Sequence, residues 1–238
     1  MDSVHSDLRA NRLLALLDDA TLHAVAPALE PARLELRQLL WDEGQPMEHA
    51  WFPAAGVLSM LGAVASDTKI EVGTIGSEGV LAVPMLLGAQ RSPGIVFVQV
   101  EGAGWRMPAA AFAAATQAHP GFLRVMHAYT YALFVQVSQG TACNRAHAVE
   151  QRCARWLLQT HDRVRGNAFD LTQEFLAHML GERRATVNQV ASMLQHRGLI
   201  RYTRGHIEVT DRDGLEAAAC PCYRFVRDEY ERILVPQA

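Results

Sequence analysis

Hydrophobic residues recur along this chain with two different spacings, and the change between them divides the chain into parts. Between residues 8 and 30, leucine and valine positions follow helical spacing. From Ala32 to Met107, short apolar runs alternate with glycine, proline and aspartate, and Ile95–Val100 is rich in β-branched residues. Such runs, with turn signals every eight to twelve residues or so, favour an antiparallel barrel or jelly roll. Helical spacing returns after Pro108, so the pattern predicts an α+β fold.

A long helix is predicted to start at Pro120 or Gly121 and to reach about Arg145. At the rise of an α-helix, about 25 residues would span roughly 37 Å. Two neighbouring apolar seams share Met126 and Leu133; the first adds Phe122, Tyr129 and Gln136, and the second adds Leu123, Thr130 and Val137. Such a seam is typical either of a helix buried in its own core or of a helix that pairs with a second copy.

A two-helix pattern follows between Leu171 and Val209. Thr172 is a good N-cap for a short helix whose apolar face is Phe175, Leu176, Met179 and Leu180. Gly181 suits a tight turn between crossing helices. The second helix is predicted from about Arg183 to Arg197, with Val187, Val190, Ala191 and Leu194 as its apolar stripe. Two short strand-like runs, Leu199–Tyr202 and Ile207–Thr210, then predict a hairpin with a basic tip.

The opposite face of the second helix is rich in hydrogen-bond donors that are long enough to reach base edges or phosphates. Helix, glycine turn, polar helix and basic hairpin together indicate a winged helix-turn-helix, although a solvated pair of helices has similar spacing. The candidate DNA-binding residues are Thr172, Gln173, Arg183, Arg184, Thr186, Asn188, Gln189, Ser192 and Arg204.

This segment resembles the DNA-binding half of the Crp/Fnr superfamily of bacterial transcription regulators. The resemblance depends on Leu171-Thr172, Gly181, Arg184, Thr186-Val187 and Leu199-Ile200. It covers about forty residues, which is the length of the predicted helix-turn-helix and wing together, and more weakly most of the chain. Ala185 stands where many members of the family place an acidic base-reading residue, so the operator is expected to differ from the family consensus there.

The resemblance implies a division into three parts: a cyclic-nucleotide-binding-like β-roll sensor over residues 1–119, a dimerisation helix and hinge over 120–146, and a winged helix-turn-helix with a C-terminal helix over 147–238. It implies a homodimer that binds double-stranded DNA at a pseudo-palindromic operator, and it leaves RNA polymerase open as a further partner. In the family, the helix at 120–146 pairs with its twin, which favours the dimer interpretation of the first seam.

A loop in the predicted sensor has the groups that a phosphate would need. Glycine-exposed amides, a fixed charge and a hydroxyl can each bind a phosphate oxygen. The cyclic-nucleotide-binding relatives carry a Gly-Glu pair before an Arg-Ser pair, whereas here Ser77 follows Gly76 and the carboxylate is displaced by one position. Cyclic AMP is therefore expected to bind poorly, and another ligand or no ligand stays open. The candidate ligand-binding residues are Gly76, Ser77, Glu78, Arg91, Ser92 and Ser138.

Four cysteines in a chain of this length are too few for a disulfide-stabilised scaffold, and this low number is typical of a protein in the reducing cytoplasm. None precedes Cys143, whereas the iron–sulfur members of the family carry an N-terminal cysteine cluster, so an iron–sulfur cluster is not expected. The sequence has no strong signal for haem or cyclic AMP either. Cys220 and Cys222 lie close together and suggest either apolar packing, a thiol-redox-responsive regulator or half of a metal site. We expect no metal, and the effector stays unknown.

Composition excludes several other classes. The net charge of −3 does not by itself indicate a nucleic-acid binder, so that hypothesis depends on where the arginines lie. No apolar run approaches the length of a membrane span, and the N-terminus does not resemble a secretory signal. No P-loop, GxSxG or HExxH motif occurs, and His49 is the only histidine between Ala32 and Met107. A β-barrel enzyme is therefore the alternative of a different class, and the prediction is a regulator without enzymatic activity.

Overall fold

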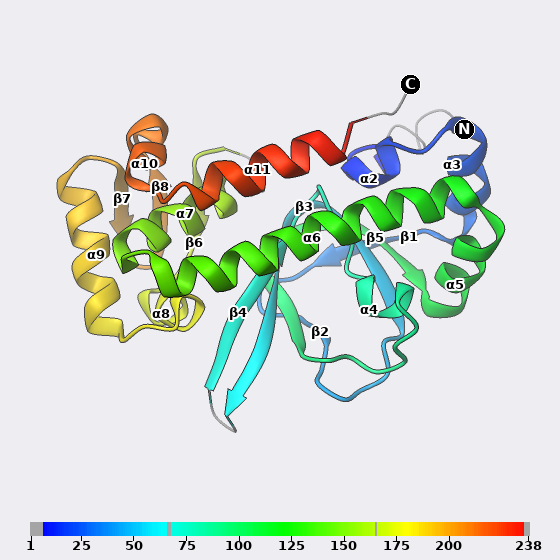
Figure 1. Cartoon of the computed structure of the whole chain (residues 1–238), viewed down its shortest axis with the longest axis horizontal. Helices are drawn as coiled ribbons and strands as arrows, with labels where there is room; N and C mark the ends of the chain where they lie inside the picture. The colour runs from blue at the N-terminus through cyan, green and yellow to red at the C-terminus, as the bar shows by residue number, and fades with distance from the viewer. Residues whose placement is uncertain (1–6, 66–67, 165, 236–238) are drawn as a thin grey trace. The chain divides into compact units, whose positions relative to one another are not determined.

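The computed structural model describes residues 7–65, 68–164 and 166–235, with side chains described outside 63–69 (Figure 1). Its residues fall into two compact units. The first comprises Met1–Met60, Thr74–Val135 and Asp228–Ala238, and the second comprises Leu61–Gly73 and Gln136–Arg227. The expected division into three functional parts, at residues 119 and 146, stays a prediction.

Short N-terminal helices cover one end of the first unit: α2 (Arg12–Ala15), α3 (Asp19–Val25) and the 3₁₀ turn η1 (Ala26–Ala28). Asn11 fastens them to the sheet. Its side-chain oxygen accepts the N–H groups of Leu13 and Leu14 at 3.0 and 3.1 Å, which caps α2. Its amide nitrogen donates to the carbonyls of Pro53 and Gly79 at 2.8 and 2.9 Å. This fully buried side chain therefore has its hydrogen-bonding groups satisfied, as burial requires.

The first unit is built on a five-stranded sheet with the order β1-β5-β3-β4, in which β2 also pairs with β5. Its strands are β1 (Glu30–Leu34), β2 (Leu39–Trp41), β3 (His49–Ala65), β4 (Thr68–Ile75) and β5 (Ile95–Pro108), and the short helix α4 (Val83–Leu86) precedes β5. The antiparallel register sets Glu30 opposite Arg106, and their side chains form an ion pair of 3.0 Å across the strands. The predicted antiparallel β structure is therefore confirmed.

One long strand contains two apolar runs of the sequence. Trp51-Phe52 and Gly56–Leu61 both belong to β3, which runs for 17 residues. Gly56 has a φ of 93°, a conformation that bends a strand without ending it and that side chains rarely adopt. The glycine therefore marks an irregularity within the strand rather than a turn between two strands.

Two helices follow the sheet, α5 (Ala109–Ala118) and the long α6 (Pro120–Ala146), close to the predicted bounds. The seam expected to meet a second copy is buried within the single chain, since Phe122, Met126, Tyr129 and Leu133 are at most 5% exposed. The Phe122 ring packs against Phe112 and Phe52, with centroids 5.7 and 6.4 Å away. The interpretation of this seam as a dimer interface was therefore wrong, because its side chains already form part of the chain's own core.

The second unit carries the predicted helix-turn-helix. Its elements are α7 (Val149–His161), β6 (Ala168–Asp170), α8 (Gln173–Leu180), α9 (Arg184–His196), β7 (Ile200–Thr203), β8 (His206–Val209), α10 (Arg212–Ala218) and α11 (Cys222–Ile233). The predicted hairpin of β7 and β8 gains a third strand, and the sheet order is β6-β8-β7. The last two helices separate near Pro221. Farther along, α11 runs beside α6 in the first unit, where Tyr230 meets Tyr129 edge to face with centroids 6.4 Å apart (Figure 1).

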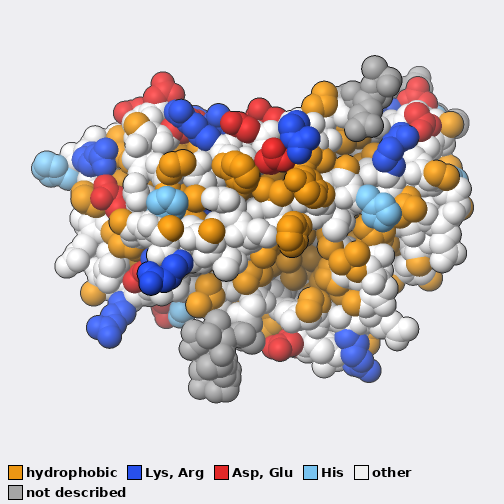
Figure 2. Space-filling model, viewed as in Figure 1, with side chains coloured by type: hydrophobic (Ala, Val, Ile, Leu, Met, Phe, Trp, Pro, Cys, Tyr) orange, Lys and Arg blue, Asp and Glu red, His pale blue; other side chains and the backbone are white. Residues whose placement is uncertain are grey.

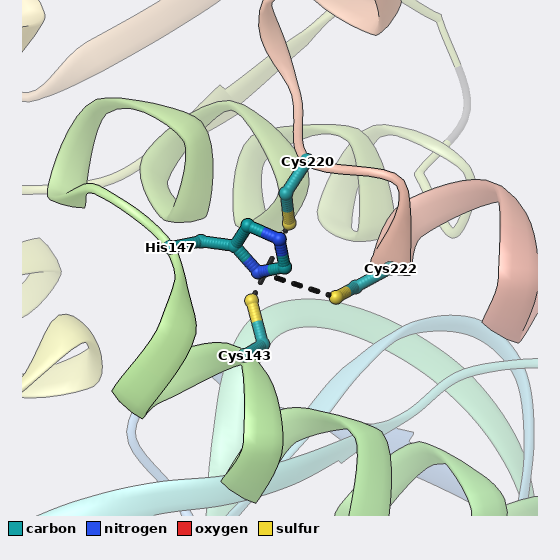
Figure 3. A group of neighbouring side chains, drawn as sticks. All are labelled: Cys143, His147, Cys220 and Cys222. Atoms are coloured by element: carbon teal, nitrogen blue, oxygen red, sulfur yellow. Dashed lines mark hydrogen bonds between the residues drawn. The ribbon is translucent and has the colours of Figure 1, made fainter.

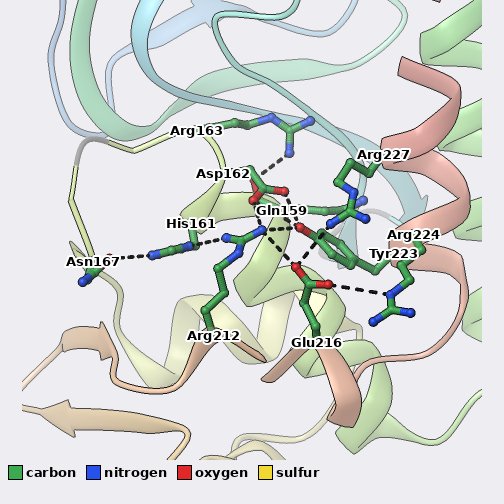
Figure 4. Close-up of polar contacts among 10 residues, drawn as sticks. All are labelled: Gln159, His161, Asp162, Arg163, Asn167, Arg212, Glu216, Tyr223, Arg224 and Arg227. Carbon is green, nitrogen blue, oxygen red and sulfur yellow. Dashed lines mark hydrogen bonds and ion pairs between the residues drawn. The ribbon is translucent and has the colours of Figure 1, made fainter. Parts of the chain in front are cut away.

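A polar network joins the end of α7 to α10 and α11 (Figure 4). The guanidinium of Arg212 donates to Asp162 and to the hydroxyl of Tyr223, both at 2.6 Å, and the hydroxyl donates to Asp162 at 2.9 Å. Glu216 forms ion pairs with Arg212 and Arg227 at 3.4 and 3.2 Å. Burial, with the neighbouring Asp162 charge, raises the pKa of Tyr223 to about 12, so its hydroxyl stays a donor.

The distal part of the β3–β4 hairpin belongs to the same unit as these helices. There the indole N–H of Trp156 on α7 donates to Glu71 of β4 at 2.6 Å. Ile70 approaches the turn at Gly181, where a Cβ would lie 3.4 Å from its Cδ1 atom. None of the helices in the described part of the chain is long and apolar enough to cross a membrane.

Candidate nucleic-acid interface

The turn between α8 and α9 forms as the sequence predicts. The hydroxyl of Thr172 accepts the N–H of Phe175 at 3.2 Å and caps α8. Gly181 ends α8 with φ 63° and ψ 35°, the left-handed conformation that glycine adopts without a steric cost. Leu176, Ala177, Met179 and Leu180 are buried, so α8 faces the core of the unit with its apolar side.

Arg152 of α7 contacts the residues on both sides of this turn. The helical spacing of α7 did not reveal this role. It is 7% exposed, and its guanidinium donates to the carbonyl of Leu180 at 3.0 Å. The same group forms an ion pair with Glu182. The charge therefore satisfies a carbonyl that the end of α8 would otherwise leave without a partner.

Helix α9 separates an apolar side from a polar side. Val187, Val190, Ala191 and Leu194 are buried, which confirms the predicted stripe. The predicted reading residues lie on the other side: Thr186 is half-buried, and Arg183, Arg184, Asn188, Gln189 and Ser192 are exposed. Gln173 on α8 donates to Asn188 at 2.8 Å, so a side chain from each helix meets on the exposed surface.

The wing is a two-residue hairpin. Arg204 and Gly205 both have positive φ, 51° and 83°, which is the signature of a type I′ turn. Tyr202 connects the wing to the start of α8, because its hydroxyl donates to the carbonyl of Leu171 at 3.0 Å. Burial raises the pKa of Tyr202, which keeps that hydroxyl protonated. At the base of the wing, His206 hydrogen-bonds Asp170 at 2.8 Å.

An open groove of about 450 Å³ lies between the two helices and the wing. The fold brings together here four residues predicted separately as DNA contacts, and adds Glu174, Tyr202 and Gly205, which were not predicted. The groove is lined by Thr172, Gln173, Glu174, Arg184, Tyr202, Arg204 and Gly205. Hydroxyl, amide and guanidinium groups thus face one surface, the combination that contacts both phosphates and base edges.

The arginines near this surface fall into two groups. Arg197 pairs with Glu150 at 2.9 Å, and Arg201 pairs with Glu208 at 2.7 Å. Within the described part of the chain, Arg183, Arg184 and Arg204 form no ion pair with a carboxylate. The charge available to an anionic partner is therefore concentrated at the start of α9 and at the tip of the wing.

The candidate sensor residues take part in internal hydrogen bonds. The buried carboxylate of Glu78 accepts the N–H of Gly76 at 3.1 Å, and the Ser77 carbonyl accepts the N–H of Arg12 at 2.7 Å. The exposed Arg91 donates to the Gly44 carbonyl at 2.8 Å, and the Ser92 hydroxyl donates to Gly94 at 2.6 Å. Ser138 is exposed on α6 in the other unit. Their role in ligand binding stays a prediction.

The comparisons with known proteins agree with this geometry. The family of Crp-like helix-turn-helix domains matches residues 151–218. FixK2 from Bradyrhizobium japonicum has a similar structure, with a TM-score of 0.68 at 13% identity, covering 81% of this chain and 98% of that one. A CRP-family regulator from Thermus thermophilus reaches 0.67 at 15% identity, covering 79% and 96%.

The global regulator CLP of Xanthomonas campestris, described as responsive to c-di-GMP, also has a similar structure. Its TM-score is 0.65 at 15% identity, with 81% of this chain and 99% of that chain covered. No curated protein matches the sequence. The structural similarities show the fold over most of the chain, and the domain match identifies the helix-turn-helix within it.

Proposed function

We propose that the chain is a DNA-binding transcription regulator of the Crp/Fnr type, and that it binds a pseudo-palindromic operator as a homodimer with α9 in the major groove. The family consists of regulators rather than enzymes. The observation that carries the proposal is the groove shared by the start of α9 and the wing, where Arg184 and Arg204 meet the polar residues of α8.

The start of α9 is the part of the interface that would read bases. In helix-turn-helix proteins, the N-terminal residues of the second helix approach the base edges. Arg184 is the first residue of α9 and is exposed, so its guanidinium has the reach for the O6 and N7 atoms of guanine. Asn188 lies one turn farther along the same face. The wing arginine, Arg204, is suited to a phosphate contact.

The dimer in this proposal uses a different face of α6 from the buried seam. Tyr131 and Phe134 are 50% and 67% exposed, although both are large and hydrophobic. Hydrophobic side chains gather on the viewed face over the middle of α6 (Figure 2). The exposed positions His127, Tyr131, Phe134, Ser138 and Thr141 follow the alternating spacing of four and three that helix pairing requires.

In vitro selection from random double-stranded DNA tests the proposal. We expect an enriched sequence with two inverted half-sites whose centres lie about one helical turn apart, because two copies of α9 would enter successive major grooves. Arg184→Ala should relax the preference at one position in each half-site. Enrichment of a single unrepeated site would contradict the dimeric arrangement, and no enrichment at all would contradict sequence-specific binding.

A further inference from the structure

Three cysteines and a histidine from two distant segments meet in the second unit (Figure 3). Cys143 lies near the end of α6, and His147 follows that helix. Cys220 lies between α10 and α11, and Cys222 is the first residue of α11. One potential ligand atom from each residue lies within 4.8 Å of all the others. The imidazole ring of His147 is directed toward the three sulfur atoms (Figure 3). Only Cys220 and Cys222 were singled out from the sequence.

Local structure explains how each segment presents two ligands. The N–H of His147 donates to the carbonyl of Cys143 at 3.0 Å, a bond that closes the last turn of α6. Residues four apart lie on the same face of a helix, which aligns the thiol with the imidazole. On the other segment, the carbonyl of Cys220 accepts the N–H of Tyr223 at 3.1 Å, and this turn directs both thiols inward.

The distances suit four-coordinate metal binding better than a disulfide. Tetrahedral zinc with bonds of about 2.3 Å to sulfur and about 2.0 Å to nitrogen sets two sulfurs about 3.8 Å apart, and sulfur and nitrogen about 3.5 Å apart. Here the sulfurs of Cys143 and Cys220 are 3.4 Å apart, and the Cys222 sulfur lies 3.5 Å from Nδ1 of His147. A disulfide would need about 2.05 Å, and all four cysteines of the chain are free thiols.

The surroundings suit a charged centre rather than apolar packing. The three cysteines are 0, 2 and 3% exposed. The side-chain amide of Gln139 donates to the Cys222 sulfur at 3.1 Å, as second partners of metal-bound thiolates do. Buried cysteines often serve as small apolar residues, but that role explains neither the imidazole nitrogen nor the amide donor among the sulfurs.

We propose that Cys143, His147, Cys220 and Cys222 form a zinc site with three thiolates and one imidazole. Thiolate and imidazole ligands in tetrahedral arrangement are those that Zn²⁺ prefers, and four protein ligands leave no open position for catalysis. The ion fastens the junction of α6 and α7 to the junction of α10 and α11. This inference does not depend on DNA binding, because the metal content of the protein and the visible spectrum of its cobalt-substituted form test the site directly.

Elemental analysis of the untagged protein, purified with a thiol reductant and without chelators, tests the site. We expect about one zinc ion per chain, and a cobalt-substituted form with the intense visible bands of tetrahedral thiolate coordination. Cys222→Ser should lose at least about tenfold in zinc affinity, as loss of metal ligation predicts. The matched control is Cys153→Ser, since Cys153 is fully buried on α7 outside the cluster and should leave zinc content unchanged.

His147→Ala provides a second variant, because His147 is only half-buried and its loss disturbs packing less than a buried cysteine would. Circular dichroism confirms that each variant is folded before metal is measured. Folded wild-type protein that binds added Zn²⁺ no more tightly than Cys222→Ser would overturn the proposal. A metal-free protein whose Cys143 and Cys220 peptides are joined by a disulfide after air oxidation would also overturn it, in favour of a thiol pair that responds to oxidants.

Discussion

In the proposed complex with DNA, Arg184 is the side chain that we expect to contribute most to base reading. Replacing it with alanine should weaken operator binding by roughly 1–3 kcal/mol and relax the preference at one position per half-site. Arg197→Ala is the matched control, because Arg197 lies at the far end of α9 and pairs with Glu150. Fluorescence anisotropy with operator and scrambled DNA separates the effects. An equal loss on both DNAs would make Arg184 a phosphate contact.

Gly181 permits the turn between α8 and α9 through its backbone conformation. Because φ is 63° there, Gly181→Ala should destabilise the fold by about 1–2 kcal/mol, which is the cost of placing a residue with a Cβ atom in the left-handed conformation. Gly140→Ala is the control: Gly140 is helical, and nothing lies within 4 Å of an added Cβ. Replacing a helical glycine should stabilise by about 0.5–1 kcal/mol. Denaturant unfolding measures both, and equal effects of the two substitutions would contradict the role of the turn.

The sensor loop predicts poor binding of cyclic AMP. The Glu78 carboxylate accepts the amide of Gly76, and Arg91 is directed to the Gly44 carbonyl. Isothermal calorimetry should therefore detect no binding of cyclic AMP or cyclic GMP at micromolar concentrations. A micromolar dissociation constant that Arg91→Ala abolishes would show that another group replaces the missing ribose-binding carboxylate.

Individual residues could be predicted where one local rule decides their position. Thr172 caps α8, Gly181 turns the chain, and the stripe from Val187 to Leu194 is buried, since each depends on a few neighbouring residues. The role of Arg152 could not be predicted in this way. Its partners Leu180 and Glu182 lie 28 and 30 residues away, and helical spacing does not reveal such a contact.

At the scale of whole elements, helix α6 shows which features the spacing of hydrophobic residues can predict and which it cannot. The pattern at Phe122, Met126, Tyr129 and Leu133 correctly marks a buried face. Periodicity does not say what covers that face, and here β3, α5 and α11 of the same chain do so. The exposed aromatic pair Tyr131 and Phe134 became apparent only once the packed chain was known.

That exposed face carries the prediction about the dimer. Phe134→Glu together with Tyr131→Glu would set like charges across the proposed seam and should convert the dimer to a monomer. Sedimentation velocity reads the oligomeric state. The control Leu87→Glu changes a residue that is 70% exposed on the loop after α4, and should not alter the mass. A double variant that still sediments as a dimer would locate the interface elsewhere.

The four proposed metal ligands also could not be predicted together from the sequence, because they belong to two distant segments. Cys143 and Cys220 are 77 residues apart, and no spacing rule for zinc sites spans a winged helix. The pair around Pro221 was visible in the sequence, but its partners belong to the end of α6. Only the folded chain shows that the helix end and the α10–α11 turn meet.

At the scale of the whole molecule, the zinc site predicts a dependence of stability on metal. A ligand that binds only the folded state stabilises it by about 4 kcal/mol at a thousandfold excess over its dissociation constant. For a chain of this size that corresponds to a rise in Tm of about 10 °C. Differential scanning fluorimetry with and without a chelator should show this shift in wild type and in Cys153→Ser, but not in Cys222→Ser. An equal shift in Cys222→Ser would place the metal elsewhere.

In the proposed complex, two copies of α9 read one operator through successive major grooves. Dimethyl sulfate interference on the selected operator tests it most directly, because methylation of guanine N7 blocks the major-groove edge. We expect two symmetric clusters of interfering guanines, centred about one helical turn apart, and the loss of one guanine from each cluster in Arg184→Ala. A single cluster, or binding that methylation of the major groove leaves unchanged, would contradict it.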